Sequence, residues 1–226
     1  MPKRLLAVIT ARGGSKRLPG KNLLPIAGKS LMAHSIIAAQ NSCCVDRVIC
    51  STDSEEIADE ARKWGCEVPF TRPTHLATDD ASSIDTLVHA VTEVSGYDYV
   101  VLLQPTSPCR LSSDIDAAVL LLAQKRASSC IAVTSGALPS LPAYTMSGGF
   151  LYRQANDFDG KAESGSLLWR PNGALYIASV KRLLETLAIE GEDVIGYPMS
   201  IERSADIDTQ SDFDQAVAAL TPQSTF

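Results

Sequence analysis

The sequence has no apolar run approaching the roughly 20 residues that a membrane-spanning helix needs. It has no low-complexity tract, and 45% of its 226 residues are hydrophobic, so a disordered or fibrous protein does not fit. The three histidines show no metal-ligand spacing, and an acidic pI of about 5.1 argues against general nucleic-acid binding. We therefore expect a soluble protein without membrane or nucleic-acid partners, built as one large α/β domain.

Paired-cysteine motifs are also missing. Six cysteines are scattered along the chain, without a CxxC pair or a histidine at zinc spacing. Cys50 and Cys130 lie in apolar runs, where a free thiol packs as a small hydrophobic group. The pattern favours structural thiols in a reducing cytoplasm over disulfides, which the even count leaves as the alternative.

Acidic residues are absent from the first 45 positions. Seven basic residues precede the first acid, Asp46: Lys3, Arg4, Arg12, Lys16, Arg17, Lys21 and Lys29. An Arg-rich, acid-poor start is typical of a transit peptide, which should form an amphipathic helix. Leu5–Thr10 is instead a continuous apolar run, and the helix-breaking residues that follow it are Gly13, Gly14, Pro19 and Gly20. This pattern indicates a buried strand that enters a turn.

Short apolar runs alternate with amphipathic helical patterns through most of the chain, as in a parallel sheet with crossover helices. Strands are predicted at Leu5–Thr10, Arg47–Ser51, Glu67–Thr71, Tyr99–Gln104, Cys130–Thr134, Ala174–Ala178 and Val194–Pro198. Helices are predicted at Leu31–Gln40, Glu55–Trp64, Ile84–Val94, Ile115–Lys125, Val180–Ile189 and Phe213–Leu220. The alternation predicts an open α/β sandwich.

Residues 135–171 interrupt this alternation. The segment contains five glycines and three prolines, with aromatic residues at Tyr144, Phe150, Tyr152, Phe158 and Trp169. Exposed aromatic residues are typical of a lid or a dimer contact, and a plain surface excursion is the alternative. We expect a lid or dimerisation segment inserted at 135–171.

The loop from Thr10 to Asn22 follows the first predicted strand, where open α/β sheets bind ligands. It is neither a Walker A loop nor a GxGxxG motif, because its glycines have the wrong spacing. Its glycines can expose backbone N–H groups, and Arg12, Lys16 and Lys21 can neutralise anionic oxygens. Three cations in one turn repel one another unless an anion joins them, so the loop predicts phosphate binding. A solvated basic loop is the alternative.

Five further segments, read with this loop, carry a family resemblance. The matching stretches, in chain order, are Ala11–Lys16 with Lys21 and Asn22, Ser51–Ser54, Arg72 and Pro73 with Leu76–Ser83, Leu103–Pro108 with Arg110, Arg170–Ala174 with Tyr176, and Asp206–Thr209 with Asp212 and Phe213. In these stretches the chain resembles the CMP-N-acylneuraminate (CMP-sialic acid) synthetases, including the CMP-legionaminic acid enzymes. One such motif would be weak evidence, whereas six in order over almost the whole chain are specific.

The resemblance implies both a fold and a reaction. The fold would be a Rossmann-like nucleotidyltransferase sandwich with three layers, a mostly parallel sheet and a small dimerisation insertion. Residues 1–226 would form a single cytidylyltransferase domain, active as a homodimer. The reaction would join CTP and an acidic nine-carbon 2-keto sugar, with Mg²⁺ as cofactor, to give the CMP-sugar and pyrophosphate.

The resemblance assigns the triphosphate to Arg12, Lys16 and Lys21, with Arg12 and Lys21 acting in catalysis. Cations at these positions would stabilise the charge that gathers on the leaving pyrophosphate. Asn22 and Arg72 match positions that meet the base, whose edge offers both donors and acceptors.

Ser83 matches a nucleotide-contacting serine in the family. A hydroxyl at this point of the chain has a second possible role, because Ser82 or Ser83 could cap the helix predicted from Ile84.

The resemblance places Asp206 and Asp208 on the metal, with Asp208 also catalytic. One residue separates them, so both carboxylates face the same side of an extended chain. Mg²⁺ is usually held by one or two carboxylates together with substrate phosphates. Asp-x-Asp before a helix is common in general, and Asp212 and Asp214 serve the dipole of the following helix.

The resemblance assigns the sugar to Gln104, Arg170, Asn172 and Tyr176. The chain departs from the family at position 162, where Ala replaces an arginine that reaches the sugar carboxylate. That leaves three basic residues, or a neighbouring subunit, to bind the carboxylate: Lys161, Arg153 and Arg170.

Two other functions remain as alternatives. Activation of the eight-carbon acid KDO is disfavoured, because that group of enzymes lacks the Gln-Pro-Thr-Ser-Pro stretch at 104–108. A nucleotide-binding regulator without catalysis would be expected to have lost the catalytic acids, whereas Asp206 and Asp208 are present.

Overall fold

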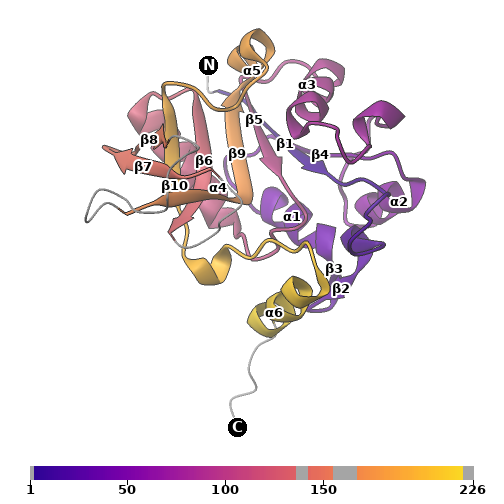
Figure 1. Cartoon of the computed structure of the whole chain (residues 1–226). Coiled ribbons are helices and arrows are strands. Elements are labelled where there is room, and N and C mark those ends of the chain that lie inside the picture. Colours follow the sequence, from indigo (N-terminus) through magenta and orange to yellow (C-terminus); the bar gives the residue numbers. More distant parts are fainter. Residues whose placement is uncertain (1–2, 136–141, 155–166, 221–226) are drawn as a thin grey trace.

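The structure is a computed structural model that describes residues 3–135, 142–154 and 167–220. Eight strands form one mixed sheet in the order β4-β1-β5-β9-β6-β10-β8-β7 (Figure 1). Their bounds are β1 Leu5–Thr10, β4 Arg47–Ser51, β5 Tyr99–Leu103, β6 Ser129–Ser135, β7 Tyr144–Ser147, β8 Phe150–Arg153, β9 Trp169–Ser179 and β10 Val194–Pro198. A separate two-stranded ribbon pairs β2 Pro25–Ile26 with β3 Lys29–Ser30.

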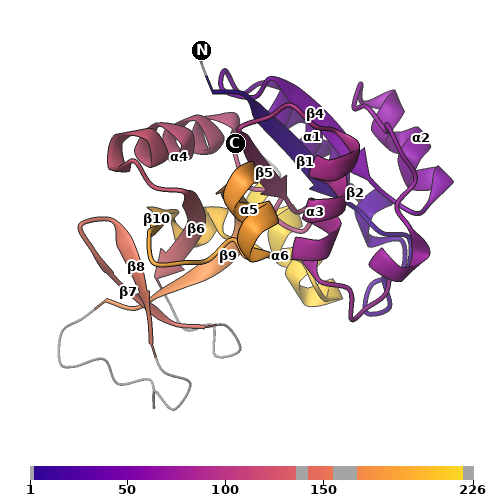
Figure 2. The same cartoon turned by 90° about the horizontal axis from the view of Figure 1, so that it is seen from above.

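Helices cover both faces of the sheet and so make three layers (Figures 1 and 2). They are α1 Leu31–Gln40, α2 Glu55–Lys63, α3 Ser83–Glu93, α4 Ser112–Lys125, α5 Val180–Thr186 and α6 Gln210–Leu220, with 3-10 turns η1 Lys21–Leu23, η2 Thr74–Leu76 and η3 Ile201–Arg203. Helices α1 and α4 lie together on one face, and α3 and α5 lie together on the other. Among the described helices, none is long and apolar enough to cross a membrane.

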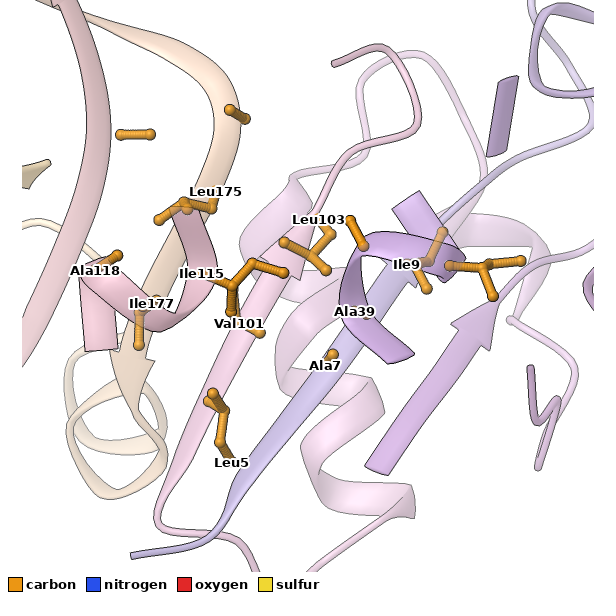
Figure 3. Close-up of a cluster of buried hydrophobic side chains, with 14 of the residues drawn as sticks. Leu5, Ala7, Ile9, Ala39, Val101, Leu103, Ile115, Ala118, Leu175 and Ile177 are labelled. Carbon is orange, nitrogen blue, oxygen red and sulfur yellow. The ribbon is translucent and has the colours of Figure 1, made fainter. Parts of the chain in front are cut away.

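The alternation of side chains along β1 explains how the sheet holds two cores. Leu5 and Ile9 pack toward α1 and α4 in the cluster of Figure 3. Leu6 and Val8 join the cluster on the opposite face, with Leu87 of α3. Each fully buried side chain of this size contributes roughly 1.5–3 kcal/mol. The continuous apolar run therefore fits a strand with helices on both sides, as the sequence predicts.

The predicted α/β sandwich with a mostly parallel sheet is confirmed, although its alternation is incomplete. Strand β9 runs antiparallel between β5 and β6. The described chain from β6 to β9 contains the β7–β8 hairpin where a helical crossover would stand. A parallel neighbour requires a long crossover, whereas an antiparallel one does not.

The strand predicted at Glu67–Thr71 is wrong. Only two isolated bridges form there, Ile49 to Glu67 and Thr52 to Thr71. Pro69 lies between the two bridges and has no N–H group to donate to a ladder. The segment therefore follows the sheet edge as a loop.

The described part of the predicted insertion contributes to the sheet. Strands β7 and β8 pair as a hairpin, and Ile195 of β10 pairs with Phe150 of β8 at the sheet edge. Two stretches of the predicted lid or dimerisation segment, 136–141 and 155–166, lie outside the described residues. Phe158, Lys161 and Ala162 belong to the second of these stretches.

Candidate active site

A cavity of about 220 Å³ opens at the carboxyl ends of β1 and β5, the edge at which open α/β sheets bind ligands. We call it the first-loop cavity. Eight of the site residues predicted from sequence line it: Arg12, Lys16, Lys21, Asn22, Arg72, Ser83, Gln104 and Asp208. They come from five separate stretches of the chain, and the fold brings them together.

Helix α6 explains how Asp208 reaches the first loop. A small core packs Ile207 and Ala216 against Leu18 and Ile26, so the carboxyl-terminal helix lies on the loop that follows β1 (Figure 1). The backbone N–H of Ile207 also donates to the Thr106 carbonyl at 2.8 Å. Ile207 thus turns inward, which leaves its two acidic neighbours to face the other way.

The Asp208 carboxylate is held by two cations of the first loop. Lys21 Nζ donates to Asp208 Oδ1 at 3.0 Å and to the Ile207 carbonyl at 2.9 Å. Arg17 Nη2 donates to Asp208 Oδ2 at 2.8 Å. We assigned Arg17 no role from sequence, although its position among the other bases of the loop was a signal.

A second carboxylate, from Asp79, joins the remaining two cations. Arg12 Nη2 lies 2.5 Å from Asp79 Oδ1, and Lys16 Nζ lies 2.5 Å from Asp79 Oδ2. Hydrogen bonds from Lys16 and Arg12 lower the pKa of Asp79 below its ordinary value. Sequence reasoning required an anion among these cations but did not identify Asp79, because 67 residues separate it from Arg12.

Asn22 and Arg72 are buried where they line the cavity. Asn22 Nδ2 donates to the Arg12 carbonyl at 3.0 Å and so fixes the turn of the first loop. Arg72 Nε donates to Ser51 Oγ at 3.1 Å, and its Nη2 donates to the Ser51 carbonyl. Burial lowers the pKa of Arg72 from its ordinary value, and these bonds keep the guanidinium in one orientation.

The start of α3 settles which serine caps the helix. Ser82 is the N-cap residue, and its Oγ accepts from the N–H of Ile84 at 3.0 Å. Ser83 is the first helical residue and lines the cavity. The capping role that we left open between the two therefore belongs to Ser82.

A second cavity, of about 390 Å³, adjoins the first and contains Tyr176, so we call it the Tyr176 cavity. The two share Ser83 and Gln104. The other lining residues are Ile84, Leu102, Ile131, Arg153, Ala188, Ile189 and Glu190. Burial raises the pKa of Tyr176 to about 12, so its hydroxyl stays protonated at neutral pH.

Glu190 is the acidic group of the Tyr176 cavity. Tyr144 Oη donates to Glu190 Oε2 at 2.6 Å, and Arg153 Nη1 lies 3.9 Å from the same oxygen. The cavity therefore combines an oriented carboxylate and a cation with a largely aliphatic wall.

Asn172 lies in an irregular part of β9, where the pairing with β6 shifts register. Its Nδ2 donates to Ser204 Oγ at 2.9 Å, and its Oδ1 accepts from the Ala174 N–H at 3.1 Å. Asn172 and Arg170 are not among the described residues that line either cavity. The buried Asn172 thus ties β9 to the loop that leads to Asp206.

Gly173 brings this irregular strand close to Gln104. Its φ is +77°, and a Cβ there would lie 3.1 Å from both Gln104 Oε1 and Ser107 Oγ. Arg110, which is also buried, donates to the carbonyls of Gln104 and Ala174. The Arg-Pro-Asn-Gly motif therefore fixes the position of Gln104 between the two cavities.

Asp206 completes the acidic pair. The side chain of Thr106 lies beside its carboxyl, and the Asp206 Cγ would lie 3.7 Å from a Cβ on Gly173. Removal of the carboxyl from water raises its pKa, and the negative charge of Asp208 raises it further. Two interacting carboxylates thus lie between the lysine of the first loop and β9.

The sheet and its covering helices have the fold of the nucleotidyltransferases. The solved structure of a CMP:2-keto-3-deoxy-manno-octonic acid synthetase complexed with CTP superposes with a TM-score of 0.76 at 19% identity, covering 96% of this chain and 98% of that one. A putative glucose-1-phosphate thymidylyltransferase from Bacillus anthracis gives a TM-score of 0.71 at 13% identity, covering 98% and 97%. At such identities the likeness shows the fold alone.

The particular family follows from sequence similarity. A cytidylyltransferase family model matches residues 6–140. A CMP-N,N'-diacetyllegionaminic acid synthase of Legionella pneumophila is 38% identical over 93% of both chains. An N-acylneuraminate cytidylyltransferase of Escherichia coli is 36% identical, covering 96% of this chain but 52% of the relative. A pseudaminic acid cytidylyltransferase of Campylobacter jejuni is 32% identical over 93% and 94%. The chain belongs to the cytidylyltransferase family, which confirms the resemblance drawn from its motifs.

Proposed function

We propose that the protein transfers the CMP group of CTP to a nonulosonic acid of the sialic or legionaminic type. The observation that carries the proposal is the meeting of the two cavities at Gln104. The first-loop cavity is lined by five cationic side chains and by the carboxylates of Asp79 and Asp208, and the Tyr176 cavity is lined by aliphatic and hydrogen-bonding groups. This pairing suits a polyphosphate on one side and an acylated sugar on the other.

The reaction is a substitution at the α-phosphorus of CTP. The hydroxyl oxygen on C2 of the sugar forms the new P–O bond and loses its proton, and the bond to the pyrophosphate oxygen breaks. Arg12, Lys16 and Lys21 would hold the triphosphate and stabilise the leaving pyrophosphate. Each such preorganised contact is worth on the order of 2–4 kcal/mol in the transition state.

The base would lie toward Asn22, Arg72 and Ser83, which line the first-loop cavity. The Arg72 guanidinium is already oriented by Ser51, so it loses little conformational freedom when it meets a base edge. The amide of Asn22 and the guanidinium together offer the donors and acceptors that a cytosine edge requires.

Asp206 and Asp208 fit a Mg²⁺ site. They supply hard oxygen ligands from two positions that one residue separates in the chain. When bound, Mg²⁺ neutralises phosphate charge and acidifies a coordinated hydroxyl. The part of this chain is to orient the pair, through the buried Ile207 between them and the Thr106 side chain on Asp206.

The sugar would occupy the Tyr176 cavity, with Gln104 between sugar and nucleotide. Its aliphatic wall suits the methyl groups of acylamido substituents, and the Tyr176 hydroxyl can donate to a sugar oxygen. Arg153 is the candidate for the sugar carboxylate that lines this cavity. Arg170 stays a predicted sugar ligand, and the bonds of Asn172 favour a role in positioning β9.

A homodimer is part of the proposal. The β7–β8 hairpin ends the strand order of the sheet, and β7 pairs with β9 at Tyr144 alone, so the rest of its outer side is a strand edge that favours association. Tyr152 on β8 is 51% exposed, and Leu167 just before β9 is 57% exposed. Exposed large apolar side chains are typical of a contact between chains.

A pyrophosphate-release assay tests the proposed function. The full chain is incubated with CTP, Mg²⁺ and either N-acetylneuraminic, N,N'-diacetyllegionaminic or KDO acid. We expect release with a nine-carbon acid and at most weak release with KDO. Preferential release with KDO would instead support the eight-carbon alternative that the structural neighbour raises. Release with none of the three would reject the proposal.

A further inference from the structure

The carboxylate of Asp79 occupies the position at which the proposed triphosphate would meet its cations. Its two oxygens pair separately with Arg12 and Lys16, both at 2.5 Å. Asp79, Arg12 and Lys16 all line the first-loop cavity. The cations that should bind an incoming anion therefore already carry an internal one.

The pairing with Asp79 offsets the electrostatic repulsion among the cations of the first loop. Arg12 and Lys16 belong to a turn with two further bases, and like charges at such distances repel. Arg17 and Lys21 share the carboxylate of Asp208 in the same manner. Asp79 thus lets the turn keep its shape in the absence of nucleotide.

The same contact is easily displaced, because it lies at the surface. The Asp79 side chain is 37% exposed and that of Lys16 is 82% exposed. Ion pairs of this kind are weak and are screened by salt. Asp79 lies in the short connection between η2 and α3, outside any helix or strand. A ligand with several negative charges can therefore replace the single carboxylate.

We propose that Asp79 is an internal counterion of the triphosphate site, which polyphosphates displace and inorganic phosphate displaces poorly. Asp79 acts here as a positioning residue that holds Arg12 and Lys16 until nucleotide arrives. It also selects among anions, because each must compete with a carboxylate already in place. The inference rests on the proposed function, since it takes these two cations as triphosphate ligands.

Calorimetric titration of inorganic tripolyphosphate and of inorganic phosphate tests the proposal without sugar or turnover. The full chain is compared with Asp79→Asn at low ionic strength. We expect Asp79→Asn to bind tripolyphosphate about three- to tenfold more tightly, and phosphate to gain at least as much. The gain should shrink as salt is added, because screening weakens the competing contact.

Asp80→Asn is the matched control. Asp80 is the next residue, is exposed, and forms no ion pair with any described residue. It removes the same charge from the same connection, so we expect its affinities to stay within about twofold of the wild type. Asp79→Glu, which keeps a carboxylate, should restore affinities close to those of the wild type.

Three results would overturn the proposal: an Asp79→Asn affinity equal to or below that of the wild type, an equal gain in Asp80→Asn, or no binding of tripolyphosphate by either protein. Asp79→Ser provides the same comparison if Asp79→Asn does not fold. If Asp79→Asn binds tripolyphosphate more tightly and the wild type turns over CTP with no sugar, the proposed function is rejected. The proposal that Asp79 is an internal counterion would still hold.

Discussion

The polar side chains in and around the site are of two kinds. Some face a cavity, and others use their polar atoms to bond with the surrounding protein. Lys21 donates to Asp208 at the cavity. Asn172 instead donates through its Nδ2 to Ser204 and accepts through its Oδ1 from Ala174, so both polar atoms of its amide are used within the protein. Arg110 is buried and lines neither of the two cavities, yet its bonds to two carbonyls fix the position of Gln104. Burial lowers the pKa of Arg110 to about 10, so it remains a cation at neutral pH. Charge alone therefore does not identify the residues that meet substrate.

Asp208→Asn should remove most activity without unfolding the protein. The amide of asparagine keeps the shape of the carboxylate, but it is uncharged. It therefore cannot neutralise Lys21 and Arg17, and it binds Mg²⁺ more weakly than a carboxylate does. We expect a loss of turnover of about 100-fold or more at saturating Mg²⁺. Asp214→Asn, an exposed acid of α6 that contacts Gln210, is the control and should keep full activity. Near-normal turnover of Asp208→Asn would remove Asp208 from the metal site.

The thiols should react in three classes, according to their exposure. All six cysteines are free, and Cys50, Cys66, Cys109 and Cys130 are buried. Burial raises the pKa of Cys50 and of Cys130 to about 12. With Ellman's reagent at pH 8, we expect Cys43 to react rapidly, Cys44 more slowly, and the buried four only in denaturant. Fast reaction of more than two thiols in the native protein would contradict this burial.

The same shifts set a pH dependence of stability. A thiol whose pKa is raised by folding contributes full stability below the unfolded pKa and loses it as pH rises toward the folded value. We therefore expect the free energy of unfolding to fall from about pH 9 upward, by roughly 1 kcal/mol per buried thiol at pH 10. Cys130→Ala should have a shallower slope than the wild type. Urea unfolding at pH 8 and pH 10 measures both slopes.

At the scale of elements, β9 links the two cavities. Its first half, Trp169–Pro171, pairs with the end of β6, and its second half pairs with both β5 and β6. The irregular stretch between the halves carries Gly173 beside Gln104. An antiparallel strand in the middle of the sheet thus places the Arg-Pro-Asn-Gly motif at the carboxyl ends of its neighbours.

Gly173→Ala should weaken both stability and sugar binding. The positive φ costs an L-residue roughly 1–2 kcal/mol. A methyl group 3.1 Å from Gln104 Oε1 and Ser107 Oγ should add on the order of 1 kcal/mol and shift Gln104. Gly148→Ala is the control, with φ +58° and no heavy atom within 4 Å of its Cβ. Equal losses of stability in the two variants, with an unchanged KM for the sugar, would contradict this role.

The sequence predicts those elements whose pattern is local. Leu5–Thr10 and Leu31–Gln40 are correct to the residue, because an apolar run and its flanking turn decide them. Helices α4 and α6 begin three residues earlier than predicted, since their first turns are polar and carry no apolar periodicity. The loop at Glu67–Thr71 has the apolar content of a strand. Pro69, which has no N–H group to donate to a strand ladder, was the signal that a regular strand would not form.

The candidate site was predictable as far as its motifs extend. The first loop and Asp208 follow from matched stretches, and the structure brings them into one cavity. Asp79 and Arg17 were missed, because their roles depend on which distant groups the fold places beside them. Glu190 was missed for the same reason: its partner Tyr144 is 46 residues away.

At the scale of the whole molecule, much of the positive charge at the start of the chain is paired with acidic residues from later in the sequence. Arg12 and Lys16 pair with Asp79, and Arg17 and Lys21 pair with Asp208. The basic start of the chain is therefore matched by acids from its middle and its end. Most of these pairs line one cavity, where substrate anions would compete for them.

Sedimentation equilibrium at micromolar concentration should find a dimer. The exposed Tyr152 on the β7–β8 hairpin is the described side chain that we expect at the interface. Tyr152→Glu should weaken association, because it would bury a charge, whereas Leu120→Glu, at an exposed position of α4, should not. A wild-type protein that sediments as a monomer would contradict the proposed homodimer.

The central claim is tested most directly by phosphorus NMR of one reaction mixture. CTP, Mg²⁺, an excess of N,N'-diacetyllegionaminic or N-acetylneuraminic acid and the full chain are followed until CTP is consumed. The account predicts one phosphodiester signal from the CMP-sugar and one pyrophosphate signal, formed in equal amounts, and neither with Asp208→Asn. Consumption of CTP to CDP and phosphate, or no consumption with either sugar, would contradict it.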